Sequence, residues 1–307
     1  MFKQITIFSL LLALSLSATM LEYKITPKGF ASSRYMQINI LDSKELKFEA
    51  LDGIDVTELS ALAYKDATLY ALSDKGYLYH FNIEIKNSKI NKLSLKKAFK
   101  LKNKKNNELK KKKRDSEGLV FLDDDLLISF ERKHRVELFS INAVKIKKIK
   151  INKSLRDAEN YESKNKGLEA VAYSKKYGVM TAPELPLKHE HGKYHTLYAK
   201  DKSWKFKARG NITALEFIDK NRVLVLLREF NEFTRKRVTT IREVNLKKCK
   251  KSICKSEVLA RLDSSDGWKI DNFEGLTKIG KNRYLMISDD NGSFFQKTLL
   301  VLFEIVD

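Results

Sequence analysis

Short apolar runs separated by polar turns dominate the pattern of this chain. Five segments repeat one order: a small residue and an aliphatic residue, a turn rich in Asp, Lys, Asn or Gly, a second aliphatic run, and a polar or acidic loop. Runs of this length, rich in β-branched and aromatic residues, are typical of strands. The small-aliphatic pairs that mark the repeat are Ala61-Leu62, Gly118-Leu119, Ala170-Val171, Ala214-Leu215 and Gly275-Leu276.

Each repeat is long enough for about four strands. A third strand closes most units, and a fourth run follows several of them, at residues 145–151, 203–208 and 257–262. Units of about four strands at a period of about 40 to 60 residues indicate a β-propeller. We therefore predict an all-β fold, a β-propeller of four-stranded blades. Five blades are counted directly, and six stays open if a degenerate unit precedes Leu51.

The last unit runs out of strands near Ile305. We predict that an N-terminal strand, over residues 35–41, supplies the missing outer strand and closes the ring. A β-sandwich of unrelated hairpins is the alternative fold. It gives no reason for Glu117, Glu169 and Glu274 to stand directly before the small-aliphatic pair. The propeller therefore explains more of the pattern.

The N-terminus has the pattern of a secretory signal peptide. Lys3 precedes an apolar run over residues 5–16, and small residues flank Leu16 at the expected cleavage region near Ser17 or Ala18. The run is shorter than the roughly 20 residues that span a bilayer, and no later stretch is apolar enough. We expect a periplasmic or secreted protein without a transmembrane segment after cleavage. The signal peptide, the N-terminal segment with the closing strand, and the propeller domain are expected over residues 1–18, 19–50 and 51–307.

The chain is strongly basic, with 60 Lys and Arg against 39 Asp and Glu and a net charge of +21. Much of the positive charge lies in residues 92–114, which we predict to be a solvated loop. No aromatic residue follows Phe99 in this run, so nucleic-acid binding is not expected. Attraction to anionic surfaces or phosphorylated ligands is compatible with the charge.

The two cysteines, Cys249 and Cys254, are close together in the sequence. In an oxidising compartment, this spacing favours a local disulfide at a hairpin tip. Two free thiols are the alternative. A zinc site is disfavoured because two thiolates are half of a ligand set and no histidine is near.

The recurrent glutamates predict a site at the propeller axis. The first strand of each blade lies nearest the axis, so Glu117, Glu169 and Glu274 should face one another. The ends of the second strands add further acids. Gathered carboxylates must be paired, protonated or bridged by a cation, and calcium suits a set of oxygen ligands. The expected metal ligands are Glu117, Glu169, Glu274, Asp289 and Asp290.

Basic and amide side chains stand beside these acids. Arg132 and Arg228 could neutralise the carboxylates or hold a phosphate, and Asn291 offers an amide. We expect these three residues to bind substrate. The competing interpretation is architectural, because a glutamate at the start of an inner strand can accept hydrogen bonds from the backbone of the next blade.

Other catalytic patterns have little support. No G-x-S-x-G sequence and no Gly-rich phosphate loop occurs, so serine-hydrolase chemistry is not indicated. The segment HEHGKYH contains His189, His191 and His195, which could bind zinc or protonate a leaving group. An exposed loop is the favoured interpretation of that segment.

Several segments together resemble the phytase-like family described as "esterase-like activity of phytase". They include DSEGLVFL, NKGLEAVAY, APELPL and NFEGL, and the resemblance covers about residues 51–305. It implies an exported propeller that hydrolyses phosphate or other esters. Phe130 and Leu227 depart from the family pattern, which has acids at both positions. The C-terminal unit matches best, at Asn272, Glu274, Gly275, Ser288, Asp289, Asp290, Asn291, Gln296 and Thr298.

The first functional hypothesis is a calcium-assisted phosphoesterase. We expect a monomer that acts on a small ester or phosphorylated substrate, with Glu274, Glu169 and Glu117 as its catalytic carboxylates. One alternative is a non-catalytic propeller that binds a ligand or protein partner. Another is a lactonase-like, metal-dependent hydrolase.

Overall fold

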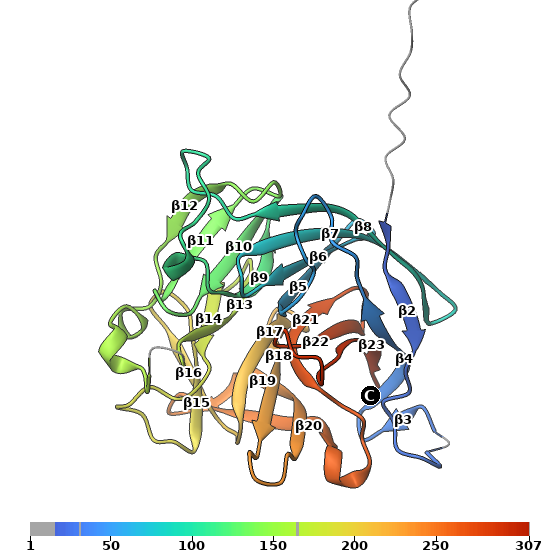
Figure 1. Cartoon of the computed structure of the whole chain (residues 1–307). Helices are drawn as coiled ribbons and strands as arrows, with labels where there is room; N and C mark the ends of the chain where they lie inside the picture. Colours follow the sequence, from blue (N-terminus) through green and yellow to red (C-terminus); the bar gives the residue numbers. More distant parts are fainter. Residues whose placement is uncertain (1–15, 31, 164–165, 307) are drawn as a thin grey trace, which may run out of the picture.

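The sequence repeat corresponds to antiparallel sheets set radially around one axis (Figure 1). The structure is a computed structural model that describes residues 16–30, 32–163 and 166–306. Within these residues there are five blades, which confirms the predicted propeller and the direct count of five rather than six. The innermost strands of the blades are β5 (Leu59–Lys65), β9 (Ser116–Leu122), β13 (Leu168–Ser174), β17 (Asn211–Phe217) and β21 (Asn272–Lys278).

The remaining strands follow in order from the axis outward. The second strands are β6 (Thr68–Ser73), β10 (Asp125–Phe130), β14 (Gly178–Pro183), β18 (Arg222–Phe230) and β22 (Arg283–Asp289). The third strands are β7 (Tyr77–Lys86), β11 (Arg135–Phe139), β15 (Tyr194–Tyr198), β19 (Arg237–Lys250) and β23 (Thr298–Ile305). The outer strands of the first four blades are β8 (Lys89–Lys100), β12 (Lys145–Ile149), β16 (Ser203–Lys207) and β20 (Ile253–Asp263).

An N-terminal strand closes the ring, as predicted. β4 (Ile38–Lys47) pairs antiparallel with β23 and becomes the fourth strand of the last blade. It begins three residues later than the predicted strand and is longer. Two short strands, β2 (Thr19–Glu22) and β3 (Arg34–Tyr35), pair with β4, and β1 (Leu16–Ser17) pairs with β8. The greater part of the predicted signal peptide, residues 1–15, lies outside the described residues.

The lysine-rich segment is a correction to the sequence prediction. Its first part is not a loop, because β8 runs from Lys89 to Lys100. Ile90, Leu93 and Leu95 are buried in this strand, whereas most of its lysines are exposed. The aliphatic side chains anchor the strand against the blade, and the charges remain solvated. A short 3-10 helix, η1 (Lys111–Lys113), lies near the end of the segment.

The interfaces between neighbouring blades form the hydrophobic core. Leu72, Leu126 and Phe130 pack between the first two blades, and Leu224 and Phe273 belong to the cluster between the last two. Three further 3-10 helices, η2 (Lys153–Leu155), η3 (Ala158–Asn160) and η4 (Ser264–Asp266), lie in connecting segments. In the part of the chain that the structure describes, no helix has the length and apolar character needed to cross a membrane.

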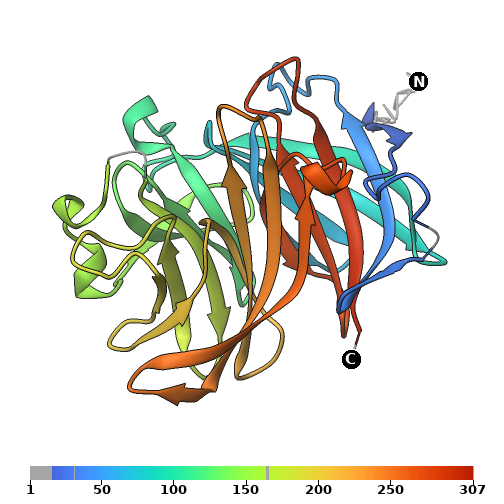
Figure 2. The ribbon, with the colours of Figure 1, turned by 90° about the horizontal axis from the view of Figure 1, so that it is seen from below.

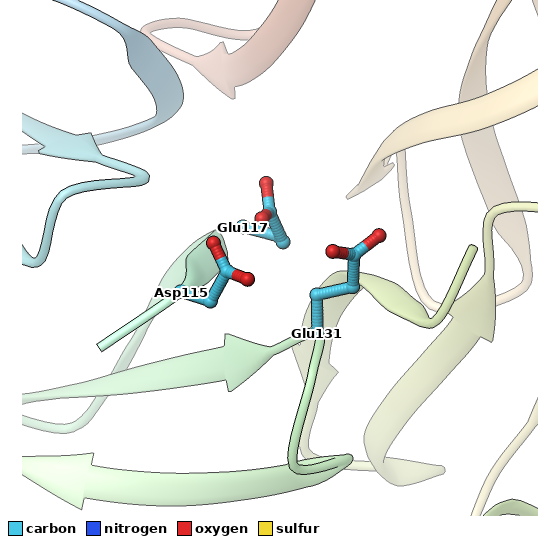
Figure 3. Close-up of side chains that lie close together, drawn as sticks. All are labelled: Asp115, Glu117 and Glu131. Carbon is cyan, nitrogen blue, oxygen red and sulfur yellow. The ribbon is translucent and has the colours of Figure 1, made fainter. Parts of the chain in front are cut away.

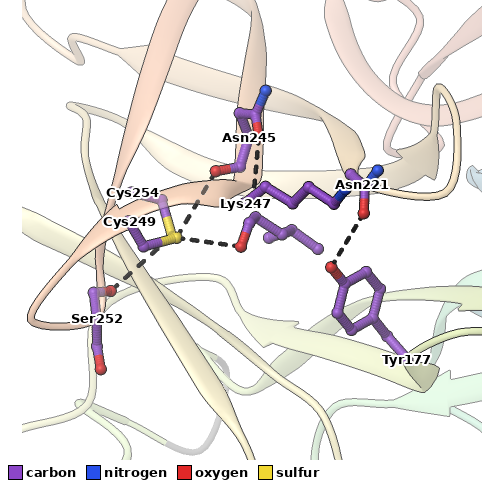
Figure 4. The surroundings of a disulfide bond; sticks show 8 residues. Tyr177, Asn221, Asn245, Lys247, Cys249, Ser252 and Cys254 are labelled. Atoms are coloured by element: carbon purple, nitrogen blue, oxygen red, sulfur yellow. Dashed lines mark hydrogen bonds between the residues drawn. A yellow bond between two sulfur atoms is a disulfide. The ribbon is translucent and has the colours of Figure 1, made fainter.

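Blades 3 and 4 are additionally joined at their outer edges. β16 pairs in parallel with β20 through Lys205 and Ile253, and the Lys205 amide donates to the Ser252 carbonyl at 2.7 Å. Figure 2 shows the hairpin β19–β20, in orange, reaching out to the yellow strands of blade 3. The predicted disulfide between Cys249 and Cys254 is confirmed near the tip of this hairpin (Figure 4).

Candidate functional site

A β-bulge recurs in all five inner strands. In each, the residue before the small-aliphatic pair is skipped in the register with the second strand. A bulge inserts an unpaired residue and re-aims its side chain. Three of these residues, Glu117, Thr213 and Glu274, line a cavity of about 10 Å³ on the axis, which has room for about one water. The five bulge residues are Ser60, Glu117, Glu169, Thr213 and Glu274.

The small residue after each bulge permits the blades to approach closely. A Cβ on Gly118 would lie 2.5 Å from Ser129 Oγ and 2.8 Å from the backbone nitrogen of Val171 in the next blade. Such contacts are too close for any larger residue. The small-aliphatic pair of the sequence therefore marks the closest packing at the axis.

The bulge residues that are not acidic serve blade packing. The Ser60 hydroxyl donates to the Ser116 carbonyl at 2.9 Å, and the Thr213 hydroxyl donates to the Phe273 carbonyl at 3.1 Å. Both bonds join neighbouring blades. The architectural role considered for the glutamates is thus filled at Ser60 and Thr213 by hydroxyl groups.

Two overlapping groups of three acids lie beside the axis. Asp115, Glu117 and Glu131 each offer a carboxylate oxygen within 4.8 Å of the others (Figure 3). Glu131, Glu169 and Glu184 do the same. We call these groups the first and second acid triads. They share Glu131, which follows the second strand of blade 2, so the acids form one continuous chain across blades 2 and 3.

Basic residues compensate only the two ends of this chain. Arg132 Nε lies 2.5 Å from Asp115, and Lys166 Nζ lies 2.8 Å from Glu184. In the described part of the molecule, no Lys or Arg forms an ion pair with the three carboxylates between them. These uncompensated acids are Glu117, Glu131 and Glu169.

Burial and mutual repulsion raise the pKa values of these acids. Desolvation is the largest cause for each of them. The pKa values of Glu117 and Glu169 are raised well above their ordinary range, with neighbouring glutamates adding to the effect. The pKa of Glu131 rises to about 7, through burial and the adjacent Asp115. Without a bound cation, the site favours protonated acids at neutral pH.

Glu274 has a different environment from the other two predicted glutamates. Arg228 Nη1 donates to Glu274 Oε1 at 2.6 Å, and the Asn272 amide donates to the same oxygen at 2.8 Å. Arg228 also lies 3.3 Å from Glu184. Burial raises the pKa of Glu274, whereas Arg228 lowers it. The structure therefore places Glu274 in a salt bridge beside the acid triads.

Asp289 and Asp290, the other two predicted metal ligands, lie outside both triads. Asp290 accepts hydrogen bonds from the hydroxyls of Thr57 and Thr298, both at 2.9 Å, and so connects the last blade to the first. Asp289 is buried, and burial and the charge of Glu274 raise its pKa to about 9. Both residues are at the end of β22, as the sequence indicated, but they do not converge with Glu117 and Glu169.

A cavity of about 560 Å³ opens beside Arg228. Asn291, another predicted substrate-binding residue, lies in its wall, whereas Arg132 lies at the opposite end of the acid chain and is half exposed. The wall holds cationic, acidic and aromatic side chains, and its three acids are Glu229, Glu232 and Asp271. Besides Arg228 and Asn291, it includes Lys166, Arg235, Arg237, Phe230 and Phe295.

The sequence prediction counted Glu131 and Glu184 among the acids at the ends of the second strands but not among the metal ligands, and it did not include Asp115. Glu131 and Glu184 follow the ends of second strands, a position already noted as acidic, and Asp115 stands two residues before Glu117. The sequence signal that could have identified Glu131 and Glu184 as site residues was therefore their position directly after a second strand. Of the three histidines, His189 and His191 are exposed and His195 is buried within β15, so they do not form one cluster.

Comparisons with known proteins agree with the fold and name a family. The family model "Phytase-like: Esterase-like activity of phytase" matches residues 54–292. No curated protein is significantly similar in sequence. Glutaminyl cyclase of Myxococcus xanthus is similar in structure, with 12% identity and a TM-score of 0.47 over 88% of this chain and 97% of that chain. The Dos1 propeller is similar at 8% identity, with a TM-score of 0.36 over 86% and 74% of the two chains. Both TM-scores are below 0.5, and the propeller fold rests on the five blades themselves.

Proposed function

Because this chain belongs to the phytase-like family, we propose that it is an exported hydrolase of phosphate or related esters that uses calcium at the acid triads. One observation carries the proposal. Glu117, Glu131 and Glu169 lie close together at the axis and have no basic partner among the described residues. Three such carboxylates are costly to bury as anions unless a cation joins them.

The donor set fits a calcium ion. The triads offer only carboxylate oxygens, which hard cations prefer, and calcium accepts six to eight oxygen ligands in flexible geometry. Zinc is less suitable because neither triad contains His or Cys. Asp115, Glu117 and Glu131 would hold the ion in the first triad, and Glu169 and Glu184 would join Glu131 in the second. A bound cation supplies Lewis-acid stabilisation of the negative charge that develops on an ester oxygen.

Arg228 lies at the Glu184 end of the acid chain, where it is positioned to bind the substrate. Arg228 is held by Glu274, Asn272 and Glu184, so its guanidinium has a fixed position between the second triad and the neighbouring cavity. A positively charged group held in this way stabilises negative charge on a substrate without reorganising during the reaction. In this proposal, Glu274 is a positioning residue that acts through Arg228.

The cavity beside Arg228 is suited to an anionic substrate. Lys166, Arg235 and Arg237 contribute positive charge to its wall. Arg235 and Arg237 stack over the Phe230 ring at 5.2 and 5.3 Å, which fixes both side chains at its edge. Exposed Phe295, in the same wall, offers an apolar surface for the organic part of an ester.

The test is turnover of aryl phosphates, aryl carboxylic esters and lactones by the full mature chain, in calcium and in EDTA. We expect calcium-dependent turnover of the phosphate ester, and loss of that turnover in Glu131→Gln, because Glu131 belongs to both triads. Calcium should also raise the melting midpoint of the wild type, by about 2.7 kcal/mol of stability at roughly 100 times the Kd.

An exposed acid provides the matched control. Asp201 is 79% exposed and lies outside both triads, so Asp201→Asn should keep both the turnover and the calcium response. Turnover of lactones alone would favour the lactonase-like reaction. A calcium response without any turnover would support the non-catalytic binding function. If calcium leaves the melting midpoint of the wild type unchanged, the proposed cation site is wrong.

A further inference from the structure

The largest cavity described lies in the cleft between blades 3 and 4, away from the acid triads. Its volume is about 920 Å³. The parallel pairing of β16 with β20 joins the outer edges of these two blades, and the cavity lies between their outer strands. Residues from β15, β19 and β20 line it, together with the connection from β16 to β17. We call this space the inter-blade cleft.

The lining of the inter-blade cleft is strongly basic. Five cationic side chains and one carboxylate, Glu229, contribute to it. Arg261 is partly neutralised, because its Nη1 lies 2.6 Å from Asp263. The other four cations form no ion pair in the described part of the chain. They are Lys193, Lys207, Arg209 and Arg242.

Arg242 is the most unusual of these cations. Its Nη1 donates to Ser256 Oγ at 2.9 Å, but its Nε is buried and has no hydrogen-bond partner in the structure. Desolvation lowers the pKa of the Arg242 guanidinium, with no carboxylate to offset it. Arg242 is half-buried, and a partly desolvated guanidinium normally pairs with an anion because removing its charge from water is costly. This guanidinium lies in the wall of a cavity that has room for an anion.

His195 provides an independent polar group in the same wall. Its side chain is 2% exposed, stacks on Phe206 at 5.8 Å between ring centroids, and lines the cleft. Its Nδ1 has no hydrogen-bond partner in the structure. Buried polar atoms in native proteins are almost always hydrogen-bonded, so an orphaned nitrogen in a residue of the cleft wall indicates a ligand or ordered water.

We propose that the inter-blade cleft binds a phosphate-type oxyanion, held by Arg242 and His195 with Ser256 at their side. The two Nη groups of the planar Arg242 guanidinium can make a two-point contact with a tetrahedral oxyanion, which is the geometry that favours Arg over Lys. His195 Nδ1 would accept a hydrogen bond from a hydroxyl of the hydrogen phosphate, because the ring also bonds the backbone of Gly210 and its pKa is lowered to about 4. Lys193, Lys207 and Arg209 increase the local positive potential and attract the anion to the cleft.

The cleft proposal does not depend on the proposed hydrolysis. The acid triads attract cations and the cleft attracts anions, so the two sites can be measured separately. Isothermal titration of the full mature chain in EDTA with inorganic phosphate, pyrophosphate, sulfate and acetate tests the cleft without any bound calcium. We expect phosphate and pyrophosphate to bind, sulfate to bind more weakly, and acetate to bind least.

Variants locate the binding on Arg242. Arg242→Gln should weaken phosphate binding about tenfold or more, because a charge-assisted contact is lost, and Arg242→Lys should restore only part of it. Lys255→Gln, on the same hairpin but outside the cleft lining, should bind as the wild type does. If Lys255→Gln weakens binding as much as Arg242→Gln, the attraction is a diffuse surface charge effect and the proposal is wrong.

The NMR signals of the His195 ring provide a second measurement of phosphate binding. A purely structural role of His195 would not make these signals respond to phosphate. Phosphate should shift the imidazole nitrogen resonances of His195 in a labelled protein, at the concentrations that saturate the titration. His189, which is exposed and outside the lining, serves as the internal control. Ser256→Ala replaces Arg242→Gln if the latter does not fold. The absence of both a titration heat and a selective His195 shift would overturn the proposal.

Discussion

The acid triads and the inter-blade cleft are opposite in charge, but both contain charged side chains without an oppositely charged partner. Among the residues that the structure describes, Glu117, Glu131 and Glu169 at the triads have no basic ion-pair partner, and Arg242 in the cleft has no acidic one. The net charge of +21 would allow every acid a cation, yet the basic residues are not distributed in that way. The comparison shows that net charge does not describe either site. Local pairing decides which ion each site attracts.

Arg228 pairs with Glu274 and with Glu184 of the second acid triad, and its removal should have the largest effect. Arg228→Gln leaves Glu274 and Glu184 buried with one fewer cation, and breaking a buried pair costs about 3–5 kcal/mol. We expect a correspondingly lower stability in denaturant unfolding. Phosphate binding in the inter-blade cleft should be unchanged, because Arg228 does not line it.

A double-mutant cycle checks the cause of this loss. Glu274→Gln in the Arg228→Gln background should recover part of the stability, because the uncompensated carboxylate is removed. Arg222→Gln is the matched control. Arg222 pairs with Asp219 and Glu243 at a more exposed position, where an ion pair contributes about 0–1 kcal/mol. Equal losses from Arg222→Gln and Arg228→Gln would show that burial does not distinguish the two pairs.

The fold was largely predictable because the same strand pattern recurs in five units of the sequence. Five copies of a weak strand pattern support one another, and the unit that lacked a fourth strand required a donor from elsewhere in the chain. β4 fulfils that role. The lysine run was mispredicted because charge obscured the burial of Ile90, Leu93 and Leu95 in β8, which does not follow a regular alternation. A charged outer strand and a charged loop have similar composition.

The candidate site was only partly predictable from the sequence. The recurrent Glu before a small residue identified Glu117, Glu169 and Glu274, and all three occupy the same bulge position in their blades. The sequence could not show that Arg228 of blade 4 forms a salt bridge with Glu274 of blade 5. It also could not show the cleft, since Arg242 and His195 belong to different blades and are related only by their packing.

The dependence of stability on pH should separate the two regions in EDTA. Asp289, near the triads, has its pKa raised from 3.8 to about 9 by burial and by Glu274. The folded state then retains a proton that the unfolded state has lost, so stability should fall as the pH rises through this interval. His195, in the cleft, has its pKa lowered from 6.5 to about 4, mainly by burial. Its contribution is present above about pH 6.5 and is lost as the pH falls towards 4.

Melting midpoints of variants between about pH 5 and pH 9 measure these two slopes. Asp289→Asn should flatten the alkaline decline, and His195→Gln should flatten the acidic one. Asp201→Asn should change neither slope, because Asp201 is exposed. Calcium should reduce the alkaline decline, since it compensates the ionised acids around the axis. An alkaline decline that persists unchanged in Asp289→Asn would exclude this aspartate as its source.

The smallest expected effect concerns the disulfide, and it should affect only the cleft. Cys249 and Cys254 join the end of β19 to the start of β20 (Figure 4). These two strands also carry Arg242 and Ser256. The loop that the bond closes is short, so replacing both cysteines with serine should cost about 2 kcal/mol in the chain-entropy account. Phosphate affinity should fall modestly as the hairpin loosens, whereas the calcium response should persist because no triad residue lies on this hairpin. Dithiothreitol on the wild type should reproduce both results, and an equal loss of the calcium response would show that the two regions are mechanically coupled.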